Sequence, residues 1–231
     1  MVYGILASLF PESCPACGLA SEGGFCRVCA ANLARVAHAC RGCGLAQPVA
    51  HCPRKEMAWD IDAVIAPFSY RPPLDHYLHA LKYRGNRVMA RALALLLHPS
   101  LASVGGVDAL VAVPLHRSRL RERGYNQAQE IARVLARALE VPALMRGIAR
   151  HVATPAQAGQ GALARRRSVA RAFRVERDLT GLRVAIVDDV VTTGATVNAL
   201  AVELKAAGAA RCVVLAVART EEHAQARNPN F

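Results

Sequence analysis

The second half of the chain consists of apolar runs that alternate with amphipathic stretches. Apolar runs at Asp108–Pro114, Val184–Val187 and Arg211–Ala218 predict buried strands. The first two runs are each followed by a polar stretch and then by apolar residues at helical spacing. The two helical stripes consist of Ala128, Ile131, Ala132, Leu135 and Leu139, and of Val197, Leu200, Ala201 and Leu204. Strands that alternate with helices predict an α/β fold, with a parallel sheet flanked by helices.

Between residues 58 and 105 the pattern predicts one strand and two helices. The strand is expected over Ile61–Tyr70, and the second helix over Val88–Leu97. The stripe of the first helix consists of Leu74, Tyr77, Leu78 and Leu81. Three basic residues near the end of that helix could either reach a phosphate or simply face solvent: Lys82, Arg84 and Arg87.

The stretch Arg183–Thr196 (RVAIVDDVVTTGAT) joins a strand to its helix and carries the most specific pattern in the chain. Two carboxylates, Asp188 and Asp189, precede a hydroxyl-rich turn, Thr192–Thr196, that contains one glycine. Backbone N–H groups at a helix N-terminus, together with Thr hydroxyls, can hold a phosphate. The carboxylates would repel a phosphate and instead suit sugar hydroxyls or a hydrated Mg²⁺. The pattern predicts a sugar-phosphate site, and the alternative is that Asp and Thr serve only as helix caps.

Positive charge is concentrated in one segment of the chain. The formal net charge is +12, and the segment from His116 to Arg174 contains thirteen arginines, no lysine and three glutamates. Such a segment beside a phosphate site could bind a highly charged phosphate ligand, or it could form a groove for single-stranded DNA. A high arginine content can also reflect genome composition.

The remaining composition narrows the class of protein. The chain is 53% hydrophobic, which excludes a disordered protein. No apolar run is long enough to cross a membrane. Val2–Phe10 is too short, and no Lys or Arg precedes it, so it does not have the pattern of a signal peptide. We therefore expect a cytoplasmic protein without a membrane span.

Seven of the eight cysteines precede position 53 and repeat one spacing. Pairs of the form Cys-x-x-Cys, in a chain with no secretion signal, favour a metal over disulfides. Two such pairs complete a tetrahedral Zn²⁺ site, and a site with four thiolates has no open position for water. The first half therefore predicts a structural zinc that folds a short segment, with four ligands: Cys14, Cys17, Cys26 and Cys29.

The second half repeats the spacing with Cys40, Cys43 and Cys52, but Lys55 stands where the fourth thiolate would be. Either His51 or His38 would have to complete a second zinc site. A metal-free remnant is an alternative, and so is an arrangement in which the pairs are exchanged between the two halves.

The stretch Arg183–Thr196 resembles the phosphoribosyl-pyrophosphate (PRPP) signature of type I phosphoribosyltransferases. In that family two acids grip the ribose 2′- and 3′-hydroxyls, and the turn binds the 5′-phosphate. The resemblance implies that Asp188 and Asp189 are the catalytic acids and that PRPP binds together with Mg²⁺. It also implies that seven residues hold the phosphate: Val190, Val191, Thr192, Thr193, Gly194, Ala195 and Thr196.

Another string is similar to the ComF (competence protein F, or GntX-like) branch of that superfamily. The matching residues are Pro114, Arg119, Arg123, Gly124, Tyr125, Asn126 and Gln127. In the type I fold this loop approaches the pyrophosphate, which implies such a role for Arg117, Arg119 and Arg123. Asn126 could instead be only the N-cap of the following helix.

The segment Thr154–Phe173 resembles the ComF flap, although Ser168 stands where Asn is usual. The resemblance implies a mobile flap that closes over PRPP and carries Gln157 and Arg165. The alternative is an exposed basic loop without a part in catalysis.

The resemblance covers nearly the whole chain and implies its organisation. Residues 1–57 would form a cysteine-rich, zinc-finger-like module, and residues 58–231 a phosphoribosyltransferase-like domain with a hood over 58–105 and a core over 106–220. ComF proteins are linked to DNA uptake and natural transformation. We therefore expect a PRPP-binding protein of the ComF type that acts in DNA uptake, with single-stranded DNA and the uptake machinery as partners. The alternative is a true transferase that moves ribose 5-phosphate from PRPP to a base or another nucleotide-metabolism acceptor, which no residue identifies.

Overall fold

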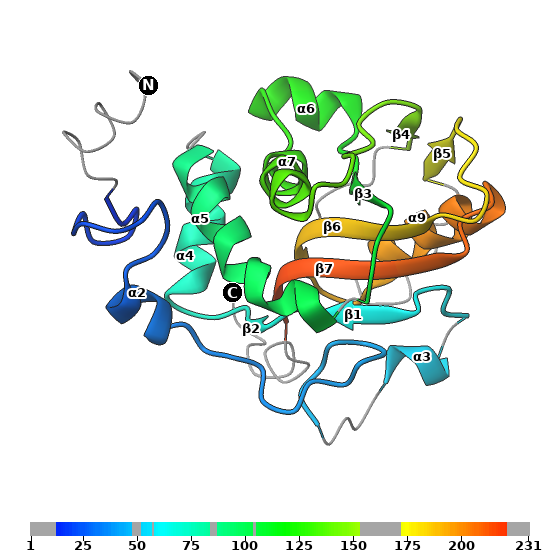
Figure 1. Cartoon of the computed structure of the whole chain (residues 1–231). Coiled ribbons are helices and arrows are strands. Elements are labelled where there is room, and N and C mark those ends of the chain that lie inside the picture. The colour runs from blue at the N-terminus through cyan, green and yellow to red at the C-terminus, as the bar shows by residue number, and fades with distance from the viewer. Residues whose placement is uncertain are drawn as a thin grey trace, which may run out of the picture.

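A parallel five-stranded sheet with helices on both faces forms the centre of the molecule (Figure 1). This computed structural model describes residues 13–47, 52–56, 58–83, 87–103, 105–152 and 172–220. The strand order is β1 (Ala63–Ile65), β7 (Arg211–Arg219), β6 (Arg183–Val191) and β3 (Ala109–Ala112), and β2 (Phe68–Ser69) also pairs with β7. All of these pairs are parallel, as the sequence predicts.

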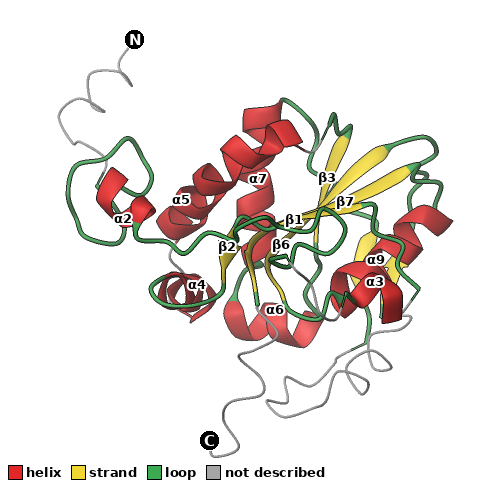
Figure 2. Ribbon diagram, turned by 90° about the horizontal axis from the view of Figure 1, so that it is seen from below, coloured by secondary structure: helices red, strands yellow, loops and turns green. Residues whose placement is uncertain are grey.

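Alternate side chains of the sheet enter two separate cores. In β6, Ala185 and Val187 belong to one buried cluster, whereas Val184 and Ile186 belong to the other. Figure 2 shows α5 and α7 on one side of the sheet and α9 on the other. The long helices are α4 (Leu74–Tyr83), α5 (Arg87–Leu97), α7 (Gln127–Leu139) and α9 (Ala195–Ala206). Burial on both faces explains why the strands of this sheet read as continuous apolar runs.

The strand expected over Ile61–Tyr70 is two short strands, so that part of the prediction is wrong. Strand β1 ends at Ile65 and β2 begins at Phe68, with Pro67 between them. Proline has no N–H to donate to the neighbouring strand, which interrupts the ladder. The Pro67 carbonyl instead accepts a hydrogen bond from the N–H of Val36, at 2.9 Å.

The arginine-rich stretch after β3 was expected to be a loop, but most of it is the helix α6 (Arg117–Arg123). His116 caps its start by accepting the N–H of Ser118, and Gly124 ends it with a positive φ of 76°. No side chain of α6 is buried, which is why no apolar stripe marks it in the sequence.

The cysteine-rich segment packs beside α4 and α5, where Figure 1 shows the short helix α2 (Arg27–Ala31). The rings of Phe25 and Tyr77 lie 5.0 Å apart, and Leu33 is buried in the same core cluster as α4 and α5. A second short helix, α3 (Pro53–Glu56), follows Cys52. The segment therefore shares a core with the rest of the chain rather than forming one alone.

The remaining elements are the 3-10 helix η1 (His98–Ser103) and an antiparallel pair formed by β4 (Ile148–Arg150) and β5 (Phe173–Val175). Gln157 and Arg165 of the expected flap lie in the chain between these two strands and are outside the described residues. Within the described ranges, no helix is long and apolar enough to cross a membrane.

Candidate functional site

The two carboxylates of the signature lie within β6 rather than after it. The strand runs past Asp188, which is aligned with Ala216 of β7, as far as Val191. The N–H of Asp189 donates a hydrogen bond to Oδ1 of Asp188, at 2.9 Å. Burial and the adjacent charge of Asp189 raise the pKa of Asp188 well above its usual range. Two buried, adjacent carboxyl groups are stabilised by hydroxyl donors or by a cation. The sequence predicts such partners for a sugar site.

Lys82, at the end of α4, supplies a cation to this pair. Its Nζ lies 2.7 Å from Oδ2 of Asp189. Burial lowers the pKa of Lys82, but the charge and hydrogen bond of Asp189 together with the charge of Asp188 raise it above its usual value. The side chain of Gln127 donates a hydrogen bond to the Lys82 carbonyl, at 3.4 Å, and so connects the start of α7 to the end of α4. Of the two readings that the sequence left open for Lys82, exposure to solvent is therefore wrong.

The sequence contains a signal that Lys82 lies on the inward face of its helix. Leu74 and Leu78 are buried, and Lys82 follows at the same spacing of four, on the same helix face. Arg84, which was grouped with Lys82, lies outside the described residues.

The turn after the acids leads directly into α9. Val190 and Val191 end β6, and Gly194 is the N-cap of α9 with a positive φ of 81°. A glycine cap offers no side chain to the first turn of the helix, although Thr193 Oγ1 accepts the N–H of Ala195 at 3.3 Å. The N-terminus of a twelve-residue helix thus begins at the turn, which is the arrangement that favours an anion.

The close packing of Trp59 also requires a glycine at position 194. A β-carbon at this position would lie 2.6 Å from the ring of Trp59. Trp59 is held there by Asn198 of α9, which accepts the N–H of Asp60 at 2.8 Å and donates to the carbonyl of Ala58 at 2.9 Å. The chain that leaves the cysteine-rich segment is thereby fixed against the turn, and sequence analysis missed both Trp59 and Asn198.

Arg219, at the end of β7, holds the other side of the turn. Its side chain is buried, with Nη1 donating to the carbonyl of Val191 at 3.0 Å and also to the carbonyl of Thr192. Its Nε donates to the carbonyl of Cys43 at 3.0 Å. A single buried side chain thus connects the turn to the second cysteine cluster, a contact that no local sequence pattern indicates.

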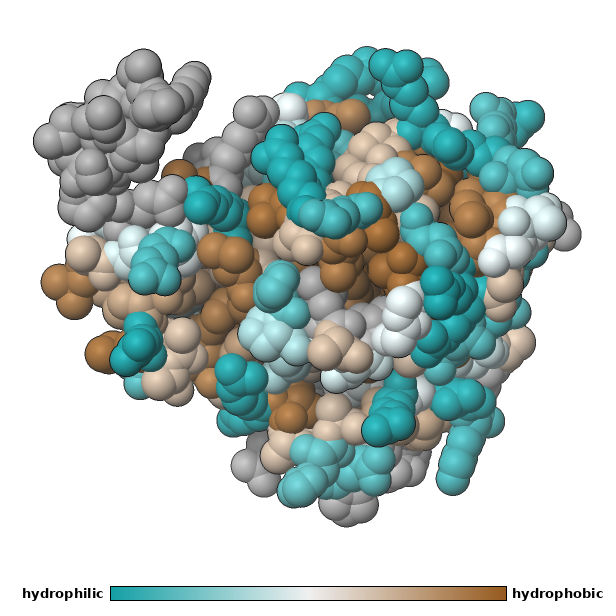
Figure 3. All heavy atoms as spheres, viewed as in Figure 1, coloured by the Kyte–Doolittle hydropathy of each residue, from teal (hydrophilic) through white to brown (hydrophobic). Residues whose placement is uncertain are grey.

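The predicted basic residues occupy α6, over which Figure 3 shows hydrophilic side chains gathered. Arg117 is exposed, whereas Arg119 and Arg123 are partly buried. Burial and the charge of Arg119 lower the pKa of Arg150, while Asp188 acts in the opposite direction on the same guanidinium. Arg119, Arg150 and Asp188 therefore share one electrostatic environment.

Arg150 is a candidate site residue that the sequence analysis missed. It ends β4, and its guanidinium lies 5.5 Å from the ring centre of Phe173 in β5.

Asn126 is the N-cap of α7 and is buried. Its Oδ1 accepts the N–H of Ala128 at 3.0 Å, and its Nδ2 donates to the Val113 carbonyl at 2.9 Å. The capping alternative is confirmed for Asn126.

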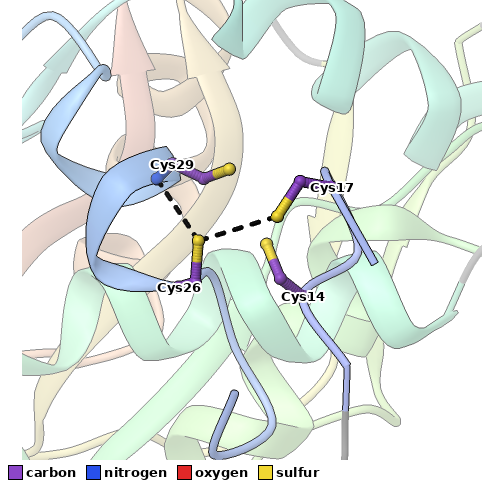
Figure 4. A group of neighbouring side chains, drawn as sticks. All are labelled: Cys14, Cys17, Cys26 and Cys29. Atoms are coloured by element: carbon purple, nitrogen blue, oxygen red, sulfur yellow. Dashed lines mark hydrogen bonds between the residues drawn. The ribbon is translucent and has the colours of Figure 1, made fainter. Parts of the chain in front are cut away.

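The four cysteines of the first half come together, as Figure 4 shows. Their sulfur atoms all lie within 4.8 Å of one another. The Sγ atoms of Cys17 and Cys26 are 3.7 Å apart, close to the separation of about 3.8 Å that tetrahedral bonds of about 2.3 Å to zinc would give. The residues therefore fit a zinc ion.

The acidities of these thiols are also consistent with a metal site. Burial opposes ionisation of Cys14, but hydrogen bonds from the backbone of Cys26, Ala16 and Cys17 lower its pKa to about 6. Burial and the neighbouring thiols raise the pKa of Cys29 to about 12. Four thiolates this close together need a cation to ionise together.

The second half forms its own cluster of three sulfurs, from Cys40, Cys43 and Cys52. Each half thus groups its own cysteines, so an exchange of pairs between the halves is wrong. His38 does not belong to the cluster, and His51 lies outside the described residues.

Comparison with known proteins agrees with this fold. The phosphoribosyl transferase domain family matches residues 121–230, which include α7, β6, the turn and α9. The chain therefore contains a phosphoribosyltransferase-type domain. The solved purine phosphoribosyltransferase from Pyrococcus horikoshii is 20% identical, with a TM-score of 0.37 over 56% of this chain and 72% of that one.

Two curated relatives cover nearly the full chain. The DNA utilization protein YhgH of Salmonella typhi is 36% identical over 87% of this chain and 92% of its own length. Competence protein F of Haemophilus influenzae is 30% identical over 86% of this chain and 92% of its own length. The chain belongs to the ComF family, which confirms the resemblance found in the sequence.

Proposed function

We propose that this protein binds Mg²⁺-PRPP at the junction of β6 and α9 and acts in DNA uptake. The observation that carries the proposal is a carboxyl pair near the end of β6, followed after four residues by the glycine-capped N-terminus of α9. The pair offers anionic acceptors to the two ribose hydroxyls, and the helix N-terminus offers N–H donors to the 5′-phosphate. A ribose phosphate needs both kinds of group.

The proposed roles follow from the chemistry of each group. Asp188 and Asp189 hold the ribose, and Val190–Thr196 surrounds the 5′-phosphate. Arg117, Arg119 and Arg123 of α6 neutralise the pyrophosphate, and Arg150 is placed to assist them. When bound, Mg²⁺ would help to neutralise the pyrophosphate, and the carboxylates of Asp188 and Asp189 would hold the hydrated ion through oxygen ligands of the kind it prefers. In the flap, Gln157 and Arg165 remain candidates to cover the ligand.

We propose zinc as the metal of the first cysteine cluster. The spacing of the sulfurs fits a tetrahedral site, and all four ligands are thiolates. Such a site has no position for a substrate, so its part is to fold the segment that packs against α4.

The role in DNA uptake is supported by the relatives and by charge. Relatives of nearly equal length are named for DNA utilization and competence. The segment from His116 to Arg174 contains thirteen arginines against three glutamates. A basic segment of this kind can bind the phosphate backbone of a single strand without reading its bases.

The decisive experiment separates binding of PRPP from transfer of its ribose. Titration calorimetry with PRPP is expected to show binding that requires Mg²⁺, and ribose 5-phosphate, which lacks the pyrophosphate, should bind more weakly. A panel of bases and nucleotides is then added while pyrophosphate release is followed. Turnover with any acceptor would establish the transferase alternative, in which an acceptor displaces pyrophosphate at ribose C1. A folded protein that does not bind PRPP would contradict the proposal.

Binding of a single-stranded oligonucleotide should depend steeply on salt. A site that neutralises three phosphates loses roughly twentyfold in affinity between 50 and 200 mM salt. Fluorescence anisotropy measures this slope, and Arg117→Gln combined with Arg121→Gln is expected to reduce it. Arg27→Gln, which removes an exposed charge from α2, is the control. Binding that is absent at low salt, or that does not respond to salt, would argue against a DNA surface.

A further inference from the structure

We propose that Lys82 makes this site selective for a ribose that carries a pyrophosphate. In the free protein its ammonium occupies an oxygen of Asp189 that a ribose hydroxyl would use, and on binding it moves to the pyrophosphate. Ribose 5-phosphate offers the displaced ammonium no such partner, because its one phosphate lies at the turn before α9. This role for Lys82 rests on the proposed function, since it concerns the same site and the same ligand.

The ammonium of Lys82 covers part of the carboxyl pair. Its Nζ lies 2.7 Å from Oδ2 of Asp189, a distance typical of a hydrogen bond between charged groups. That oxygen is buried, although the residue as a whole is partly exposed. A sugar hydroxyl can therefore reach Oδ2 only after the ammonium has moved away.

Lys82 is fixed at its backbone and adaptable at its side chain. Leu78 and Leu81 are buried on the same helix, and the Lys82 carbonyl accepts a hydrogen bond from the side chain of Gln127, at 3.4 Å. The ammonium, by contrast, stands at the end of a flexible four-carbon stem, and 26% of the side chain is exposed. The ammonium can thus change partner while α4 stays in place.

Cations from three elements act on the carboxyl pair. Burial lowers the pKa of Lys82 in α4, and the charges of Asp189 and Asp188 raise it. Burial and the charge of Arg119 in α6 lower the pKa of Arg150 in β4, and the charge of Asp188 opposes them. The acids are therefore within electrostatic range of Lys82 and of the arginines. An anion that enters beside the acids meets positive charge from both.

An exchange of partners keeps the ammonium compensated at each stage. Without a ligand, Lys82 offsets the negative charge of Asp189. A neutral hydroxyl that displaced it would leave a partly buried ammonium without a counter-charge, which costs free energy. A pyrophosphate at ribose C1 restores a charge-assisted hydrogen bond. A ribose without pyrophosphate must therefore break an ion pair without forming another.

The variant Lys82→Met tests this selectivity through two affinities. Calorimetry in excess Mg²⁺ measures PRPP and ribose 5-phosphate with the wild type and with the variant. The preference for PRPP over ribose 5-phosphate is expected to fall about tenfold, which is the contribution of one hydrogen bond between charged groups. Ribose 5-phosphate should bind more tightly to the variant, because no ammonium has to be displaced. An unchanged preference, with both affinities altered by the same factor, marks a merely structural role and would overturn the proposal.

The matched control is Lys205→Met. Lys205 lies in the last turn of α9, its Nζ is 3.3 Å from Oδ2 of Asp62, and its side chain is exposed to a similar extent. The substitution removes the same charge and one ion pair, and it should change neither affinity. A fall in preference equal to that of Lys82→Met would assign the effect to net charge instead of to Lys82.

A second measurement follows the ammonium in the wild type and does not depend on how the variant folds. The chain has three lysines, Lys55, Lys82 and Lys205, so labelling with ¹³C,¹⁵N-lysine gives three side-chain signals that single substitutions assign. Saturation with Mg²⁺-PRPP is expected to shift the Lys82 signal and to leave the other two in place. Asp189→Asn without ligand supplies the reference position of a released ammonium. A Lys82 signal that does not move at saturation would overturn the exchange.

The outcomes separate this role from the proposed function. If the wild type does not bind PRPP, the proposed function fails and the role of Lys82 fails with it. If the wild type prefers PRPP and Lys82→Met keeps the full preference, only the role of Lys82 fails.

Discussion

Replacement of both signature carboxylates, Asp188→Asn with Asp189→Asn, is expected to abolish measurable PRPP binding and to leave the fold intact. The substitution keeps the size of each side chain but removes the anionic acceptors that would hold the ribose hydroxyls. A hydrogen bond to a charged group contributes roughly 1.5–3 kcal/mol, so the loss of two weakens binding by more than about a hundredfold. Calorimetry with Mg²⁺-PRPP gives the affinity, and thermal unfolding gives the control for the fold.

A companion set of variants separates the binding role of this pair from its structural role. Asp189→Asn, alone or in the double mutant, removes the carboxylate that lies 2.7 Å from Lys82 Nζ and should lower Tm while the chain still folds. Adding Lys82→Met removes the unpaired ammonium and should restore stability but not PRPP binding. Unchanged PRPP affinity in the folded double mutant of the two acids would overturn their assignment to the ribose.

Loss of one ligand from the first cysteine cluster, through Cys14→Ser, is expected to release zinc and destabilise the N-terminal segment. The free energy of metal binding is available to the fold only while the metal is held. A loss of about 4 kcal/mol would lower Tm by roughly 10 °C in a chain of this size. Metal analysis, thermal unfolding and limited proteolysis of residues 13–47 measure the effect, and chelation of the wild type should reproduce it.

The matched control is Cys212→Ala. Cys212 is buried in β7 and belongs to neither cysteine cluster, so its replacement should leave the metal content unchanged. Absence of zinc from the freshly purified wild type would contradict a structural zinc at the first cluster.

The sheet and its two covering layers could be predicted from the sequence because their pattern is local. Strands β3 and β7 and the first part of β6 contain apolar runs, and α7 and α9 carry apolar stripes at helical spacing. Where the local pattern is weak, the prediction failed. Helix α6 buries no side chain and therefore has no stripe, and the run Ile61–Tyr70 looked continuous although Pro67 divides it.

The candidate site was predictable only in part, for a physical reason. Asp188, Asp189 and the turn are consecutive in sequence, so their chemistry can be read as one motif. Asn198 and Arg219 act through contacts with residues more than a hundred positions away, at Ala58 and Cys43. Such contacts depend on how the elements pack, and each of these residues taken alone is an ordinary polar side chain.

The packing of Trp59 against Gly194 gives the protein an optical property. Trp59 is the single tryptophan of the chain, and its indole N–H is buried with no hydrogen-bond partner among the described residues. All of the indole emission therefore comes from one ring that touches the turn at the start of α9. The unmodified protein thus carries its own fluorophore beside the turn where PRPP binding is proposed, and binding can be followed by fluorescence without a label.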